Sequence, residues 1–143
     1  MAITPTEYVV GFMFDTEGES VALIEKNRPS WQKGKLNGIG GHIEPGESPI
    51  DAMVREFREE TGHDSSSFPW GKFATLSGDQ YVVHFFTSIG PVRSLQTTTD
   101  ERVSVYNKNC VTIDNAVPNL TYLLPLAALF LMSRQGHLKI EEA

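Results

Sequence analysis

The sequence predicts an α/β fold in which a mixed β-sheet lies between helices. Three observations favour it: short runs of β-branched and aromatic residues are separated by turn residues, an amphipathic helix is expected over residues 49–61, and an apolar helix is expected over residues 120–134. Strands and helices joined by mostly short connections are typical of a sheet covered by helices. Because the 143 residues contain no repeat or low-complexity linker, we expect one domain over residues 1–143.

The strands are expected as short segments, and two pairs of them form hairpins. Residues 16–20 form the turn between the first and second strands, and Gly78-Asp79 joins the other pair. Residues 36–44 contain three glycines, which indicates that the backbone there bends or closely approaches another group. The expected strand segments are residues 7–15, 21–26, 36–44, 72–77, 80–89, 102–107 and 110–113.

The helix over residues 49–61 has clear start and end signals. Ser48 offers a capping hydroxyl, and Pro49 suits the first helical position. Asp51 in the first turn favours the helix dipole, and Gly62 ends the helix. Apolar or small residues recur at three- and four-residue steps, which predicts one buried face made of Ile50, Met53, Val54, Phe57 and Thr61.

Composition limits the classes of function. The net charge of −6 argues against binding a nucleic acid polymer, which needs a basic surface, but not against binding one nucleotide through a metal ion. The single cysteine, Cys110, indicates a reducing compartment, and its apolar neighbours predict a buried thiol. The first residues lack the features of a signal peptide, and residues 120–132 are too few to span a bilayer. We therefore expect a cytoplasmic protein without a membrane partner.

Three glutamates crowd one edge of the predicted helix. Glu56, Glu59 and Glu60 fall within one arc of about 100°, roughly a third of a turn away from the apolar face. Like charges at this spacing destabilise a helix. Two interpretations follow: a solvated face neutralised by Arg55 and Arg58, or a site for a cation. Hard divalent ions prefer such oxygen ligands, and the nearby glycine-rich stretch would let a diphosphate approach.

The spacing of this region resembles a known motif. Residues 41–64, GHIEPGESPIDAMVREFREETGHD, fit the Nudix box G-x5-E-x7-R-E-U-x-E-E-x-G-U, where U is a bulky aliphatic residue. All seven fixed positions match, while Phe57 is aromatic and His63 stands at the last U position. The resemblance implies an α/β/α sandwich, and hydrolysis of a nucleoside diphosphate linked to another moiety with Mg²⁺ or Mn²⁺. Such ions polarise phosphate oxygens and make an attacking water more acidic.

The same resemblance implies roles for single residues. Arg55 would pair with a glutamate and hold the geometry of loop and helix. The segment TDERVSVYN is similar to an SDEM segment of some family members, whose glutamate approaches the metal; here that residue is Glu101. Which glutamate acts as general base stays open. The implied metal-site residues are Glu56, Glu59 and Glu60, assisted by Glu47, with Gly41 as a backbone position.

The substrate is predicted from weaker signals. The run LNGIGG resembles the NGFGG run of family members that hydrolyse oxidised purine nucleoside triphosphates, which implies a base contact for Asn37 beside Gly40. The segment 117–126 resembles their WPDDSYWFPL, but Asn119 and Leu120 replace its aspartates, which puts the oxidised-purine preference in doubt. Asn37 is equally well explained as a turn residue, and Asn119 as a helix cap.

Side chains of the loop before the glycines complete the predicted substrate site. Lys35, with Lys33 and Arg28, either meets a triphosphate tail or is a solvated loop charge. Trp31 and Trp70 are candidates for stacking on a base, with Trp31 favoured because it lies in a polar loop.

These observations predict a pyrophosphohydrolase that converts a nucleoside triphosphate to monophosphate and pyrophosphate. One alternative is a hydrolase of ADP-ribose, a nucleotide sugar or a dinucleoside polyphosphate. A non-enzymatic alternative is a nucleotide-binding sensor that keeps the fold without the chemistry. The expected partner is a small-molecule nucleotide, and a homodimer is considered because members of this family often pair.

Overall fold

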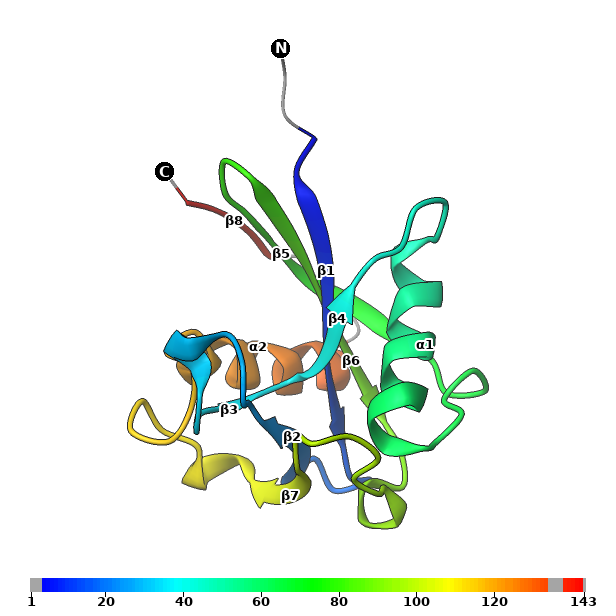
Figure 1. Cartoon of the computed structure of the whole chain (residues 1–143). Helices are drawn as coiled ribbons and strands as arrows, with labels where there is room; N and C mark the ends of the chain where they lie inside the picture. The colour runs from blue at the N-terminus through cyan, green and yellow to red at the C-terminus, as the bar shows by residue number, and fades with distance from the viewer. Residues whose placement is uncertain (1–3, 134–137, 143) are drawn as a thin grey trace.

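The computed structural model describes residues 4–133 and 138–142, which form a mixed sheet with a helix on each face. Helix α1 (Pro49–Thr61) lies against one face and α2 (Leu120–Ser133) against the other (Figure 1). The α/β prediction is therefore confirmed. The strands are β1 (Thr6–Phe14), β2 (Ser20–Glu25), β3 (Leu36–Asn37), β4 (Ile39–His42), β5 (Gly71–Ser77), β6 (Tyr81–Ile89), β7 (Val103–Asn107) and β8 (Leu138–Glu141).

Strand β1 is the centre of the sheet. The main strand order is β3-β2-β1-β6-β5-β8, with β1 and β6 parallel, and β7 pairs with β2. β1 pairs with β2 at Met13 and Phe14, and with β4 from Tyr8 to Gly11. β4 runs so close that a Cβ at Gly40 would lie 1.8 Å from the carbonyl oxygen of Val9. The glycine-rich stretch is thus explained by close backbone approach.

Alternation along β1 divides the core into two clusters. Phe12 and Phe14 point to the α2 side, and Val9 and Met13 point to the α1 side. All four are fully buried. This alternation is the expected pattern of a strand covered on both faces.

Helix α1 begins and ends where its sequence signals predict. The Ser48 hydroxyl accepts a hydrogen bond from the Asp51 N–H at 3.2 Å, and Gly62 ends the helix in the left-handed region with φ of +74°. Met53, Phe57 and Thr61 are buried. The prediction for Ile50 is wrong, because the residue is 39% exposed, whereas Ala52 in the same turn is fully buried.

The predicted strand over residues 110–113 is also wrong. A short 3₁₀ turn, Lys108–Cys110, precedes a turn organised by Asn115, whose side chain accepts from the Thr112 N–H at 2.9 Å and donates to the Cys110 carbonyl at 3.0 Å. These bonds use backbone groups that a strand would need for pairing. Cys110 is exposed, which corrects the prediction of a buried thiol.

The carboxyl-terminal region differs from the sequence prediction in one further respect. Strand β8 pairs in parallel with β5, and the sequence did not predict it. The predicted helix is confirmed as far as Ser133, while residue 134 lies outside the described residues. Within residues 4–133 and 138–142, no helix has the length and apolar character required to cross a membrane.

Candidate functional site

Arg55 lies among the glutamates that the sequence singled out. Its guanidinium donates to both carboxylate oxygens of Glu47 at 2.8 and 2.9 Å and to Glu56 at 2.9 Å. Its contacts with Glu59 are longer, at 3.3 and 3.4 Å. The guanidinium also donates to the backbone carbonyl of His42 at 2.9 Å, which ties the end of β4 to the helix. We call Arg55, Glu47, Glu56 and Glu59 the Arg55 cluster.

The carboxylates of the Arg55 cluster differ electrostatically. Hydrogen bonds from Arg55 lower the pKa of Glu47 to about 2. Burial raises the pKa of Glu56, although Arg55 opposes the shift, because its carboxylate is only 13% exposed. The Glu59 carboxylate is 56% exposed. Glu47 is therefore held firmly as an anion, burial makes Glu56 costly to ionise in spite of its bond to Arg55, and Glu59 is the most open to solvent of the three.

Gly41 makes room for the Glu56 carboxylate. A Cβ at position 41 would lie 2.5 Å from the Glu56 carboxyl carbon and 2.6 Å from each of its oxygens. The absence of a side chain on β4 therefore lets a carboxylate of α1 lie directly against the strand backbone. This contact gives a physical reason for glycine at a position that the motif singles out.

A second group of charged residues forms beside the end of α1. The buried Glu101 accepts from Lys26 Nζ at 3.1 Å and from the backbone N–H groups of Asn27 and Arg28 at 2.6 and 3.4 Å. The Thr99 hydroxyl donates to Glu60 at 3.1 Å. We call Glu60, Glu101, Lys26 and Thr99 the Glu60 cluster. Its members come from three separate parts of the chain, which the fold brings together.

The two acids of the Glu60 cluster shift in opposite directions. Burial raises the pKa of Glu60, and the negative charge of Glu101 raises it further. Burial opposes ionisation of Glu101 as well, but its bonds to the Asn27 N–H and Lys26 outweigh it and lower the pKa. At neutral pH Glu101 is thus held as an anion whose field disfavours a second charge on Glu60.

The donor set suits a hard divalent cation, although the carboxylates do not already converge on one. Among residues 4–133 and 138–142, no three acidic, histidine or cysteine side chains are arranged as a ready coordination group. Arg55 explains this, because Glu47, Glu56 and Glu59 all turn toward it. An ion such as Mg²⁺ keeps several waters and substrate phosphates, so one or two carboxylates suffice to hold it. Glu56 and Glu60, whose ionised forms are disfavoured by burial, fit that requirement.

The two asparagines predicted to contact a base are brought onto adjacent segments. Leu36 donates its N–H to the Asn115 carbonyl at 2.8 Å and accepts from the Val117 N–H at 3.0 Å, so the chain before Asn37 runs beside the chain before Asn119. Asn37 accepts from the Gly38 N–H at 2.8 Å and donates to Gln32 at 3.1 Å, which matches the turn interpretation.

Asn119 does not cap α2 through its side chain. Its backbone carbonyl accepts from the N–H groups of Tyr122 and Leu123 at 3.2 and 3.0 Å. Its Oδ1 atom is buried and has no hydrogen-bond partner among the described residues. Such an atom is costly unless another molecule satisfies it.

The predicted loop residues have different environments. Trp31 is 66% exposed within a short 3₁₀ turn, Ser30–Gln32, and Lys35 is half-buried at the end of the same loop. The prediction for Trp70 as a stacking residue is wrong, because it is buried against Phe57 with ring centroids 5.2 Å apart, and its indole N–H donates to Ser65 at 2.9 Å.

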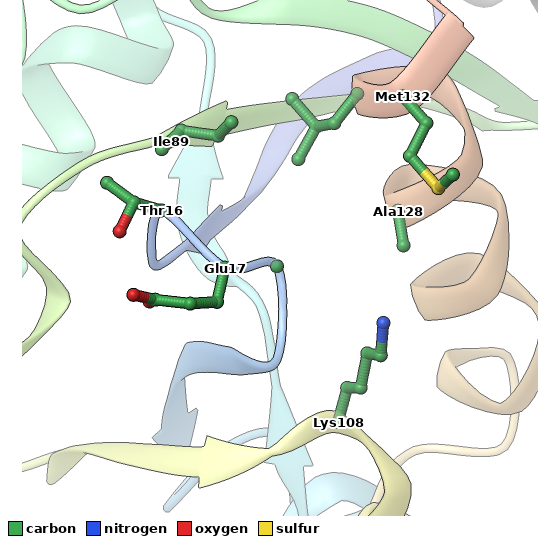
Figure 2. A pocket seen from close by; sticks show the side chains of 8 residues that line it. Thr16, Glu17, Ile89, Lys108, Ala128 and Met132 are labelled. Atoms are coloured by element: carbon green, nitrogen blue, oxygen red, sulfur yellow. The ribbon is translucent and has the colours of Figure 1, made fainter.

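The sequence did not predict Lys26 or Thr99 as site residues. Both are unremarkable in the local sequence, and only their distant partners in the fold give them a role. A pocket between the β1–β2 turn, the end of β6 and the last turns of α2 contains none of the predicted site residues (Figure 2). Met132 and Ala128 line it from α2, opposite Glu17. The charged clusters, and not this apolar pocket, therefore define the candidate site.

Comparison with known proteins finds one matching family model. A family model described as NUDIX domain matches residues 4–127. A sequence comparison with curated proteins finds no significant match.

Three solved structures resemble the fold at low sequence identity. A NUDIX hydrolase from Nitrosomonas europaea aligns with a TM-score of 0.74 and 15% identity over 97% of this chain and 80% of its own. A NUDIX family hydrolase from Clostridium perfringens gives 0.71 and 17%, covering 90% of this chain and 99% of its own. A structure from work on MutT of Aliivibrio salmonicida and Vibrio cholerae gives 0.60 and 20%, covering 73% and 79%. At these identities the likeness shows the fold alone.

Proposed function

The chain belongs to the Nudix domain family, and from that premise we propose that it is a nucleoside triphosphate pyrophosphohydrolase using Mg²⁺ or Mn²⁺. The reaction of the family is metal-dependent hydrolysis of a nucleoside diphosphate linked to another group, and the chain is a Nudix hydrolase. We propose three points beyond the family reaction: the substrate is a triphosphate, it is cleaved to monophosphate and pyrophosphate, and the ion is Mg²⁺ or Mn²⁺. The main support for the proposal is that the Arg55 cluster and the Glu60 cluster lie along one edge of α1.

The chemistry follows from what each cluster can do. When bound, a divalent ion polarises the phosphate oxygens and makes an attacking water more acidic. Glu56 and Glu60 would hold such ions, because a bound cation would offset the cost of burying their charges. Arg55 keeps Glu47 and Glu56 in fixed positions through three hydrogen bonds of 2.8 to 2.9 Å. Arg55 is therefore occupied by carboxylates and acts as an orienting residue.

Two carboxylates remain to handle the proton of the attacking water. Glu101 is held as an anion by Lys26 and two backbone N–H groups. Glu59 is more exposed and only loosely held by Arg55. A general base needs an ionised carboxylate within reach of the water. Glu101 and Glu59 are therefore the two candidates for the general base.

The substrate class is supported by the segments around Asn37 and Asn119. The buried, unpartnered Oδ1 of Asn119 would accept a hydrogen bond from an amino or ring N–H group of a base. The Asn37 oxygen is occupied by the Gly38 N–H, so Asn37 contributes through its remaining amide hydrogen. Gly40 lies against the β1 backbone at Val9 and so fixes the path of the chain just after Asn37. Trp31 offers an exposed ring, and Lys35 offers a cation for the phosphate tail.

A substrate panel tests the proposal directly. The protein is incubated with the common and oxidised nucleoside triphosphates, ADP-ribose, a nucleotide sugar and a dinucleoside polyphosphate, each with Mg²⁺ and with Mn²⁺. We expect monophosphate and pyrophosphate from at least one triphosphate, and no orthophosphate as primary product. Cleavage of the other diphosphates without any triphosphate turnover would overturn the substrate class. Nucleotide binding without turnover of any compound would favour the sensor alternative.

A further inference from the structure

Residues 96–101 lie along the last turn of α1 and are bonded to it repeatedly. The Gln96 N–H donates to the Thr61 carbonyl at 3.1 Å, and the Thr98 N–H donates to the Glu60 carbonyl at 3.4 Å. The Thr98 hydroxyl donates to the carbonyl of Glu59. These contacts reach the backbone of the helix and fix the path of the segment.

Thr99 differs from its neighbours because its hydroxyl joins two acidic residues. The hydroxyl donates to Glu60 Oε2 at 3.1 Å and accepts from the Glu101 N–H at 3.2 Å. One oxygen atom therefore links a carboxylate on α1 to the backbone of the loop that carries the other carboxylate. The two glutamates are 41 positions apart in the chain, and Thr99 provides a short connection between their positions.

The pair of acids needs such a link. Thr99 is bonded both to the Glu60 carboxylate and to the Glu101 backbone, so these two acids lie close together and repel each other when both are ionised. Lys26 offsets the charge of Glu101 at 3.1 Å. A carboxylate that keeps one oxygen in a hydrogen bond retains its other oxygen for a cation or a water. Without the hydroxyl, repulsion would turn Glu60 away from Glu101.

We propose that Thr99 is a positioning residue whose hydroxyl holds the Glu60 carboxylate beside Glu101 in the orientation that binds a divalent cation. The inference rests on the proposed function, because it gives that orientation a use in hydrolysis. The proposed role of Thr99 is to hold Glu60, and this role does not depend on which nucleotide is the substrate. Direct cation binding can therefore test it separately from substrate turnover.

The test compares three variants with the parent protein. Thr99→Val removes the hydroxyl at nearly constant volume, Thr99→Ser restores it, and Thr98→Val removes the neighbouring hydroxyl that reaches only the helix backbone. Mn²⁺ affinity is measured by calorimetric titration of the nucleotide-free proteins, and kcat and KM are measured at one fixed Mg²⁺ concentration well below saturation. We expect Thr99→Val to weaken Mn²⁺ binding and lower kcat by about tenfold each, with KM changed by less than about twofold. Thr99→Ser should return both quantities to within about twofold of the parent.

The control and the failures are distinguishable. Thr98→Val should lower the melting temperature while leaving Mn²⁺ affinity within about twofold of the parent. Parent-like Mn²⁺ binding by Thr99→Val, equal losses in the Thr98 and Thr99 variants, or no rescue by serine would each overturn the inference. Thr99→Ala provides the same comparison if the valine variant misfolds. If the parent cleaves no triphosphate but Mn²⁺ binding follows the expected pattern, only the proposed substrate fails; a parent that binds no Mn²⁺ refutes both.

Discussion

The Arg55 cluster and the Glu60 cluster offset the repulsion between neighbouring carboxylates in different ways. Each crowds carboxylates along α1 and includes its own cation. Arg55 makes hydrogen bonds to three glutamates and to the His42 carbonyl, whereas the Lys26 ammonium, within the part of the chain that the structure describes, donates to Glu101. The Arg55 cluster is drawn from residues close in sequence, while the Glu60 cluster joins distant segments.

The difference indicates that the Arg55 guanidinium has a structural role, whereas the Lys26 ammonium can exchange its partner. A guanidinium whose donors are distributed among carboxylates and a backbone carbonyl loses many bonds if it moves. An ammonium is a point charge on a flexible stem, so it can follow a new anion such as a phosphate. We therefore expect Arg55 to determine stability and carboxylate orientation, and Lys26 to respond to ligands.

The largest expected effect comes from neutralising a proposed metal ligand in either cluster. Glu56→Gln and Glu60→Gln should each lower kcat more than about a hundredfold, because each removes a charge that holds the ion. Glu44→Gln is the matched control, since its carboxylate is 65% exposed and 3.8 Å from Arg55. Steady-state kinetics with Mg²⁺ provides the measurement. Equal losses in Glu44→Gln and Glu60→Gln would show that general surface charge, and not a site, supports activity.

Arg55→Lys should destabilise the protein by about 2 kcal/mol, because an ammonium cannot reproduce the forked hydrogen bonds to Glu47 and Glu56. The Arg55 side chain is 24% exposed, so solvent replaces only part of what is lost. Arg58→Lys on the exposed side of the same helix should stay within about 0.5 kcal/mol of the parent. Urea unfolding measures both. Similar values for the two variants would contradict the structural role of Arg55.

Gly41→Ala should disturb the Arg55 cluster while sparing the Glu60 cluster. The added methyl group would overlap the Glu56 carboxylate at 2.5 to 2.6 Å, so the carboxylate must move. We expect Mn²⁺ affinity to fall by about tenfold. Gly18→Ala is a useful control, because its positive φ of +71° strains the backbone but nothing lies within 4 Å of the new Cβ. It should lower stability without changing Mn²⁺ affinity, as titration would reveal.

The smallest expected effect is a pH dependence that separates Glu47 from Glu56 and Glu60. Burial raises the pKa of Glu56 and of Glu60 above 4.5, so each destabilises the folded protein once ionised and binds a cation only in that form. The rise in melting temperature caused by Mn²⁺ should therefore be full at neutral pH and decline before the pH reaches 4.5.

Glu47 should behave in the opposite way. Its pKa is lowered from 4.5 to about 2, so its stabilising pair with Arg55 is complete above 4.5 and is lost only as the pH falls toward 2. Thermal melts from pH 7 to pH 3, with and without Mn²⁺, separate the two effects. A Mn²⁺-dependent rise that persists unchanged below pH 4.5 would contradict the assignment of Glu56 and Glu60.

The two clusters also show what could be predicted from sequence. Ser48, Pro49 and Gly62 predicted the ends of the helix, and its glutamates predicted the local charge cluster, because these features depend on residues within one turn or one loop. Glu101 was identified only through a resemblance. Lys26 and Thr99 were missed, because only long-range folding brings them to Glu101 and Glu60.

The wrong predictions outside the two clusters also have local or tertiary causes. Apolar character suggested a strand and a buried thiol around Cys110, but the Asn115 side chain organises a turn there. Ile50 fits the period of the helix face, yet it is exposed and Ala52 is buried instead. Trp70 follows a proline in a short loop, and its burial against Phe57 depends on the packing of α1 on the sheet.

A crystal structure with Mn²⁺ and a non-hydrolysable nucleoside triphosphate analogue tests the central claim most directly. Anomalous scattering locates the ions without reference to activity. The account predicts Mn²⁺ bound to carboxylate oxygens of Glu56 and Glu60, at roughly 2.0 to 2.3 Å, with the phosphates completing the coordination and Arg55 still paired with Glu47. Ions bound away from α1, or an Arg55 that leaves Glu47 to contact the phosphates, would contradict it.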